Sequence, residues 1–265
     1  MDGISVTRHP LEGTDTAVVA EIMLDRPPVN ALSTALASAL AQTCAELGGE
    51  PSVRSVVVSG APGSRAFCAG ADLKERAGMS DAEIMRQRPV MRQVFGAVLA
   101  LPQPVVAAVH GFALGGGCEL ALSCDVIVAD ETAVFGLTEV TVGLVPGGGG
   151  TQLMLRRLGA GRAADLVLSG RKVGIDEAER IGLADRRVPV GAARETALDL
   201  ASRIAANSPV AVRAAKQAMR NGWGAGLAAG LDIEDAAWHT AAASADRREG
   251  IAAFAEKRPP VWPDA

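Results

Sequence analysis

The sequence predicts an α/β protein with an α/β front and an α-helical tail. Up to about residue 148, short apolar runs alternate with segments of helical character, and after that point the pattern is almost wholly helical. Runs such as VRSVVVSG (53–60) and PVVAAVHG (104–111) carry few polar residues, which is typical of strands buried on both faces. No linker rich in Pro, Ser and Gly separates the two parts, so we expect them to pack together.

The front is predicted to open with a β-hairpin. Two β-rich runs at 4–9 and 17–25 flank the turn-forming residues EGTD. A helix is expected over 33–47, because Ser33 can cap its start and Gly48 and Gly49 follow its end. The expected elements then run strand 53–60, helix 80–100, strand 104–111, helix 116–123 and strand 125–130.

The tail is predicted to be helical. Its Ala- and Leu-rich segments lie at 166–173, 197–208, 208–220 and 225–247, and no internal repeat of fixed period is present.

Composition excludes several classes of protein. The 26 basic and 30 acidic side chains give a net charge of −4, without the basic footprint of a nucleic-acid-binding protein. The start MDGISVTRHP lacks a signal-peptide pattern and no apolar run of about 18 residues occurs, so we expect a cytoplasmic protein without a membrane span. Four cysteines without CxxC spacing favour reduced core residues, and no metal is expected: Cys44, Cys68, Cys118 and Cys124.

The glycine clusters do not match nucleotide-binding motifs. GxxxxGK[ST] is absent, and GGGC, PGGGGTQ and GWGAGLAAG all fail GxGxxG. In ALGGGCEL (113–120) the glycines directly precede a predicted helix, whose free N–H groups could form an oxyanion hole. AFCAGADLKE (66–75) could supply a second donor. A tight turn and an ordinary strand-to-helix loop are the alternative interpretations of these two segments.

Two glutamates stand alone in apolar stretches. Glu119 lies in GCELALSC and Glu139 in VFGLTEVTVGLVPGGGG, so burial should raise the pKa of Glu119. Either glutamate alone could be structural, but the pair near an oxyanion-type turn favours division of general acid and general base work. The chemistry indicated is proton transfer at a carbon next to an activated carbonyl, with a water between the acids. His110 is expected to be structural, and the absence of GxSxG excludes a Ser-His-Asp hydrolase.

Several spaced motifs resemble those of the crotonase superfamily, the enoyl-CoA hydratases and isomerases. They include LDRPPVNALS, AFCAGADLKE, PVVAAVHGFALGGGCELALSCDVIVAD, FGLTEVTVGLVPGGGGTQ, SGRKVGIDEAERIGLADRRVP and DRREGIAAFAEKRPP. The combination of GADLKERAGMS, GLTEV and PGGGGTQ is similar to the methylglutaconyl-CoA hydratase branch. The resemblance implies a crotonase-like spiral of ββα units over residues 1–200, with roughly perpendicular sheets. It also implies a helical region at 201–265 that assembles homotrimers or hexamers.

The same resemblance implies roles for individual residues. The oxyanion-hole N–H groups fall on Ala71 and Gly116, Glu119 activates the attacking water, and Glu139 exchanges a proton at the α-carbon. Coenzyme A, as part of the substrate and without a separate cofactor, is expected at these positions: Pro28 in RPPVN, Ala69, Gly70, Ala71, Asp72, Leu73, Lys74, and Phe254 and Lys257, which can serve a neighbouring subunit.

The resemblance and both glutamates favour a hydro-lyase that hydrates 2-enoyl-CoA thioesters to 3-hydroxyacyl-CoA, as in fatty acid β-oxidation. A methylglutaconyl-CoA-type hydratase or an enoyl-CoA isomerase is the alternative. A catalytically silent acyl-CoA-binding protein would need a lost glutamate or a blocked oxyanion turn, and the sequence shows neither. RNA binding is disfavoured by the net charge of −4. Acyl preference should depend on a tunnel lined by the helix at 80–100 and the strand around 135–145.

Overall fold

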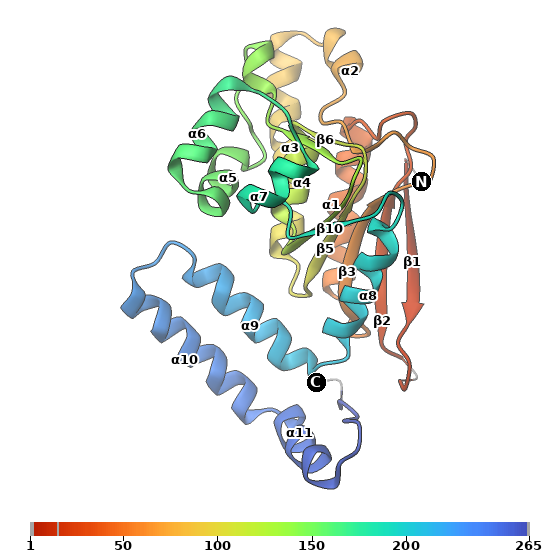
Figure 1. Cartoon of the computed structure of the whole chain (residues 1–265), viewed down its shortest axis with the longest axis vertical. Helices are drawn as coiled ribbons and strands as arrows, with labels where there is room; N and C mark the ends of the chain where they lie inside the picture. Colours follow the sequence, from red (N-terminus) through yellow and green to blue (C-terminus); the bar gives the residue numbers. More distant parts are fainter. Residues whose placement is uncertain (1–2, 15, 264–265) are drawn as a thin grey trace.

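The computed structural model describes residues 3–14 and 16–263. Its larger sheet has six strands in the order β1-β2-β3-β5-β7-β10 (Figure 1). The bounds are β1 (Ile4–Pro10), β2 (Val18–Leu24), β3 (Val53–Gly60), β5 (Val105–Val109), β7 (Val126–Asp130) and β10 (Arg186–Val188). β1 runs antiparallel to β2, in a register that pairs Ile4 with Leu24, and the other neighbours are parallel. The predicted hairpin and the three predicted strands that follow it are confirmed.

A smaller sheet of four short strands lies beside the larger one, in the order β4-β6-β8-β9. Its strands are β4 (Ala66–Cys68), β6 (Phe112–Leu114), β8 (Val134–Gly136) and β9 (Val173–Gly174). Each of β3, β5 and β7 is followed by a strand of the smaller sheet and then by a helix. This repetition is the series of ββα units that the resemblance implied.

The large sheet is covered on both faces, as the apolar strands predicted. Along β3, Val56 and Val58 belong to the main core, while Val57 packs on the opposite face with α8 (Ala193–Ala205). The main core also holds apolar residues of α1 (Thr34–Gly48), α3 (Asp81–Ala100) and α4 (Gly116–Ser123). All three helices were predicted from sequence, and Ser33 caps α1 by accepting the N–H of Leu36.

The tail is less uniform than predicted. The helix expected over 166–173 is wrong beyond Ser169, because α6 (Ala160–Ser169) ends at Gly170 with φ of 64° and β9 follows. The single helix expected over 225–247 is divided at Ser244 into α10 (Leu227–Ala243) and α11 (Ala245–Glu256). The remaining helices of this half are α5 (Gly150–Leu158), α7 (Ile175–Ile181) and α9 (Pro209–Gly222).

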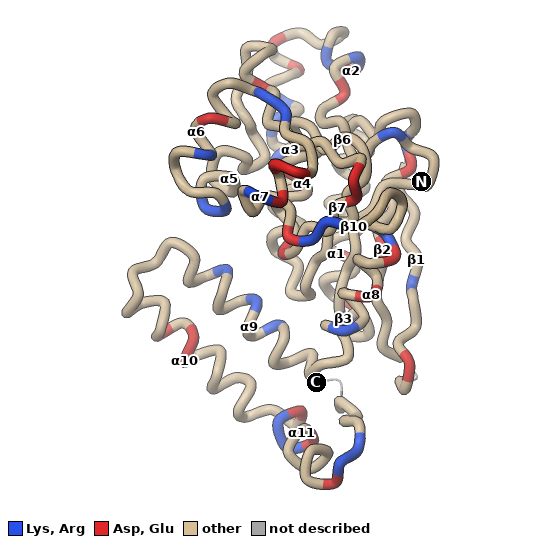
Figure 2. The backbone as a smooth tube through the Cα atoms, in the orientation of Figure 1, with Lys and Arg blue, Asp and Glu red and all other residues tan. Residues whose placement is uncertain are grey.

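The helices α9, α10 and α11 form an arm that extends from the α/β body (Figure 1). The predicted division at residue 200 falls inside α8, which packs on the sheet, and the arm begins at α9. α10 carries the acids Asp232, Glu234 and Asp235 but no Lys or Arg (Figure 2). Within residues 3–14 and 16–263, no helix is long and apolar enough to cross a membrane.

Candidate active site

The loop between β4 and α2 (Leu73–Ala77) presents the first predicted donor. Leu32 donates its N–H to the Gly70 carbonyl over 2.7 Å and accepts the Asp72 N–H over 2.9 Å, as in a parallel bridge with Ala71. This pairing turns the Ala71 N–H away from Leu32. Gly70 has φ of +90°, and a Cβ there would lie 2.6 Å from the Leu114 carbonyl oxygen, so glycine is required.

The first turn of α4 presents the second predicted donor. Its cap residue, Gly115, has φ of 50° and offers no side chain, so the Gly116 N–H lies among the free donors of the helix start. A Cβ on Gly117 would lie 1.8 Å from the Cys68 carbonyl oxygen, which shows how closely α4 approaches β4. A Cβ on Gly70 would lie 3.2 Å from the Gly116 nitrogen. The two predicted donors are therefore on adjoining segments.

Glu119 lies one turn into α4 and is 3% exposed. Its Oε1 accepts the N–H of Gly148 over 2.6 Å and that of Gly150 over 2.8 Å. A Cβ on Gly150 would lie 2.9 Å from Glu119 Oε1, and one on Gly148 would lie 2.2 Å from the Phe95 ring, so the second glycine cluster packs closely between this carboxylate and α3. Burial raises the pKa of Glu119, as predicted, against the opposing effect of these hydrogen bonds and of Arg88.

Glu139 is the first residue of the 3₁₀ helix η1 (Glu139–Val142). A Cβ on Gly115 would lie 3.3 Å from its Oε1, so the carboxylate is beside the start of α4. Its Oε2 is buried and accepts no hydrogen bond from the residues that the structure describes. Burial, and then the charge of Glu119, raise the pKa of Glu139 to about 7. The environments of the two acids therefore differ: Glu119 is held by two N–H groups, and Glu139 has one free oxygen.

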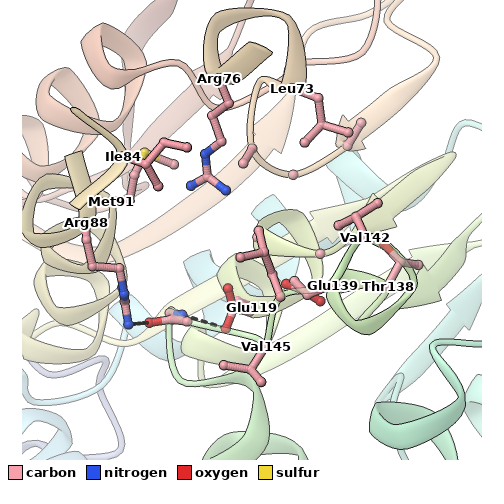
Figure 3. A pocket seen from close by; sticks show the side chains of 18 of the residues that line it. Leu73, Arg76, Ile84, Arg88, Met91, Glu119, Thr138, Glu139, Val142 and Val145 are labelled. Carbon is pink, nitrogen blue, oxygen red and sulfur yellow. Dashed lines mark hydrogen bonds between the residues drawn. The ribbon is translucent and has the colours of Figure 1, made fainter. Parts of the chain in front are cut away.

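Ala71, Gly116, Glu119 and Glu139 all line one pocket of about 270 Å³. The side chains of the two glutamates are labelled in Figure 3. These four residues were predicted from segments that lie up to 68 residues apart, and the fold brings them together. Apolar side chains make up much of the remaining wall: Leu73, Ile84, Met91, Phe95, Val142, Leu144 and Val145. The expected contribution of helix 80–100 is present, but the expected strand around 135–145 is wrong, because β8 ends at Gly136 and η1 follows.

The residues expected to contact coenzyme A are only partly together. Ala69, Gly70 and Leu73 line the pocket, whereas Pro28, Asp72 and Lys74 do not. Asp72 is buried, caps α2 by accepting the N–H of Lys74 and Glu75, and forms a 2.6 Å ion pair with Arg26. Phe254 and Lys257 belong to α11 and its C-cap in the arm, outside the pocket wall of this single chain.

Two cations in the pocket were not predicted from the sequence. Arg76 on α2 and Arg88 on α3 both line it. The segment that carries Glu139 gave no sign of a cation, because the chain from Glu131 to Leu155 contains no Lys or Arg. Arg88 donates to the Gly147 carbonyl over 2.6 Å. Arg76 is the last residue of the motif GADLKER, so the motif could have drawn attention to it. The direction of its side chain, however, depends on how α2 packs.

The other polar candidates are structural. His110 Nε2 lies 3.1 Å from the Ser64 carbonyl oxygen. The four cysteines are free and buried as predicted, and burial raises the pKa of the Cys44 thiol to about 12. Within the described residues, no group of three or more His, Cys, Asp or Glu side chains could hold a metal ion.

The fold is that of an α/β protein, and its pocket brings the Glu119 and Glu139 carboxyl groups together with the Ala71 and Gly116 backbone. The model of the enoyl-CoA hydratase/isomerase family matches residues 14–265, so the chain belongs to this family. It is 43% identical to the 2,3-dehydroadipyl-CoA hydratase of Escherichia coli K12, over 90% of this chain and 92% of the relative. It is 42% identical to the human mitochondrial enoyl-CoA hydratase domain-containing protein 2, over 98% of this chain and 90% of the relative.

Solved structures of the family have the same fold. The enoyl-CoA hydratase of Bacillus anthracis superposes with a TM-score of 0.92 at 42% identity, over 99% of this chain and 100% of that one. The putative enoyl-CoA hydratase from Streptomyces coelicolor gives 0.89 at 35% identity, over 99% of this chain and 94% of that one. The crotonase-like fold that the motifs implied is therefore confirmed.

Proposed function

We propose that the protein is an enoyl-CoA hydratase, a hydro-lyase that adds water across the 2,3 double bond of 2-enoyl-CoA thioesters. The observation that carries the proposal is the pair of carboxyl groups, Glu119 and Glu139, in one pocket with the Ala71 and Gly116 amides. The relatives' names support the same reaction class.

Negative charge on the thioester oxygen is stabilised by the two N–H donors. Addition of water at the β-carbon produces an enolate, and the N–H groups of Ala71 and Gly116 hold its oxygen. One preorganised donor of this kind typically contributes about 3–4 kcal/mol to transition-state stabilisation. Both donors are main-chain groups at fixed turns, so little reorganisation accompanies the reaction.

The two acids divide the proton transfers. Glu119, with Oε1 held by Gly148 and Gly150, uses its other oxygen to take a proton from water as that water attacks the β-carbon. Glu139, with a pKa of about 7, delivers a proton to the α-carbon of the enolate. One O–H bond of water and the π bond between C2 and C3 break, a C–O bond forms at C3 and a C–H bond at C2. Glu119 ends protonated and Glu139 ionised, and exchange with solvent returns both to their starting protonation.

The proposal also assigns a position to coenzyme A and an assembly state to the chain. Coenzyme A would lie along 69–74, with Pro28 nearby and with Phe254 and Lys257 supplied by a neighbouring chain. We propose a homotrimer or a hexamer, supported by the large apolar side chains exposed on the arm, among them Leu227, Trp238 and Phe254. A cytoplasmic location stays a prediction, and a methylglutaconyl-CoA-type hydratase or an enoyl-CoA isomerase stays the alternative activity.

Hydration of crotonyl-CoA by wild type, Glu119→Gln and Glu139→Gln tests the proposal. Loss of either carboxyl should lower kcat by about 10²–10⁴-fold, because each performs a proton transfer. Glu12→Gln, an exposed glutamate of the first hairpin turn, is the matched control and should keep wild-type activity. Full activity in either active-site variant would exclude the two-acid mechanism.

A further inference from the structure

Arg76 is a cation in an otherwise apolar part of the pocket. Its side chain extends from α2 toward the two acids (Figure 3). Around it the wall is formed by apolar side chains of α2, α3 and η1, including Leu73, Ile84 and Val142. If the acyl chain of the substrate were a plain hydrocarbon, it would displace water from the Arg76 guanidinium without offering a hydrogen-bond acceptor. Binding of such a chain beside Arg76 is therefore unfavourable.

The orientation of Arg76 is fixed by a buried amide. Its Nε donates to Gln87 Oε1 over 3.0 Å, and Gln87 is 6% exposed. Gln87 in turn donates to Thr34 Oγ1 over 2.8 Å and to Glu75 Oε2 over 3.3 Å. This chain of hydrogen bonds occupies the Nε side of the guanidinium and leaves its terminal nitrogens toward the pocket.

The terminal nitrogens of Arg76 have no hydrogen-bond or ion-pair partner among the described residues. Neither active-site glutamate approaches within ion-pair distance, although Arg76 lowers the pKa of Glu139 through space. Arg88, by contrast, is bonded to the Gly147 carbonyl. Arg76 therefore presents the paired N–H edge that binds a carboxylate in bidentate fashion.

We propose that Arg76 determines substrate specificity by binding an anionic group on the acyl chain, so that the preferred substrate is a 2-enoyl-CoA whose chain ends in a carboxylate. The inference rests on the proposed hydratase function and narrows its substrate class. Arg76 acts by positioning the acyl chain, and the reacting atoms stay with Glu119 and Glu139.

Two substrates of matched shape test the proposal. Glutaconyl-CoA carries a terminal carboxylate, and 5-methylhex-2-enoyl-CoA replaces that carboxylate with an isopropyl group of similar shape. Wild type should prefer glutaconyl-CoA by about 10- to 100-fold in kcat/KM, the usual effect of a hydrogen bond to a charged group. Arg76→Met should remove this preference while keeping or raising the rate on the neutral substrate, and Arg76→Lys should keep part of the preference.

Arg86→Met is the matched control, because Arg86 is an exposed cation of α3 outside the pocket wall. It should leave the preference unchanged. A wild-type preference for the neutral substrate would overturn the proposal, and so would an equal loss on both substrates in Arg76→Met, which would assign Arg76 to the coenzyme A moiety.

A binding experiment separates this inference from the proposed reaction. Calorimetric titration with glutaryl-CoA and 5-methylhexanoyl-CoA, which cannot be hydrated, should show the same Arg76-dependent preference. If wild type hydrates none of the enoyl-CoA substrates but shows this preference in binding, the hydratase proposal fails and the anion site stands. Equal binding of both compounds would overturn the anion site even if hydration occurs.

Discussion

At the scale of single residues, the surroundings of Glu139 make ionisation of its carboxyl group unfavourable. Its Oε2 is buried without a hydrogen bond from the described residues, and the neighbouring Glu119 carboxylate disfavours its ionisation. The protonated form of Glu139 that the proposed mechanism requires is therefore favoured by an arrangement that destabilises the folded chain. Such a conflict between stability and activity is common at functional sites.

This cost should be visible as a pH-dependent effect on stability. The pKa of Glu139 is about 7 in the folded chain, against 4.5 for an ordinary glutamate, so the folded chain binds more protons between these values. Its contribution to the free energy of unfolding therefore falls as pH rises from about 4.5 to about 7. The glutamine of Glu139→Gln cannot ionise. The free energy of unfolding of this variant, relative to that of wild type, should therefore be about 1–3 kcal/mol higher at pH 8 than at pH 5, allowing for solvent screening.

Urea unfolding at the two pH values measures this gain. Glu12→Gln should show no change in its difference from wild type, because Glu12 lies in an exposed turn. The proposed burial cost at Glu139 is contradicted if the difference between Glu139→Gln and wild type is the same at pH 5 and pH 8.

At the scale of elements, the sequence predicted long periodic segments well and short strands poorly. The start of α4 at Gly116 was predictable because free helix N–H groups follow a glycine cluster. The strands β4, β6 and β8 have three residues each, too few for a two-residue alternation to be recognised. The contacts from Gly148 and Gly150 to Glu119, and the entry of Arg76, depend on packing between segments distant in sequence.

The attachment of α9 to the body depends on charges in the interior. Lys216 Nζ lies 2.8 Å from Asp125 Oδ2 and donates to the Gln103 carbonyl over 2.6 Å, and Arg220 pairs with Asp125 Oδ1 over 2.7 Å. Lys216 is 9% exposed, so loss of its counter-charge leaves a buried ammonium group poorly compensated.

Asp125→Asn should therefore destabilise the protein by about 3–5 kcal/mol, measured as a lower Tm at fixed protein concentration. Adding Lys216→Met should recover part of that loss, since the uncompensated charge is then absent. Asp232→Asn on exposed α10 is the control and should keep the wild-type Tm. An unchanged Tm for Asp125→Asn would show that this ion pair does not hold α9.

At the scale of the whole molecule, the arm leaves several large apolar side chains exposed. Leu227 is 81% exposed, Trp238 64% and Phe254 86%, all on α10 and α11. Large apolar side chains exposed to this extent on one group of helices are typical of an interface. In the proposed assembly, Phe254 and Lys257, which lie outside the pocket wall of their own chain, would belong to the site of a neighbouring chain.

Light scattering should give the mass of three or six chains for wild type. Trp238→Glu should lower that mass, because burying a new carboxylate in an apolar interface is costly. Met85→Glu, an equally polar change at an exposed site of α3, is the control and should keep the wild-type mass. A monomeric wild type would contradict the proposed assembly.

The most direct test of the central claim is mass analysis of the product formed from crotonyl-CoA in D₂O enriched in ¹⁸O. A hydratase that uses Glu119 for water and Glu139 for the α-carbon should yield 3-hydroxybutyryl-CoA with ¹⁸O at C3 and deuterium at C2. Both labels should be lost together in Glu119→Gln and in Glu139→Gln. Recovery of the enoyl-CoA with deuterium but no ¹⁸O would contradict hydration and indicate the isomerase reaction instead.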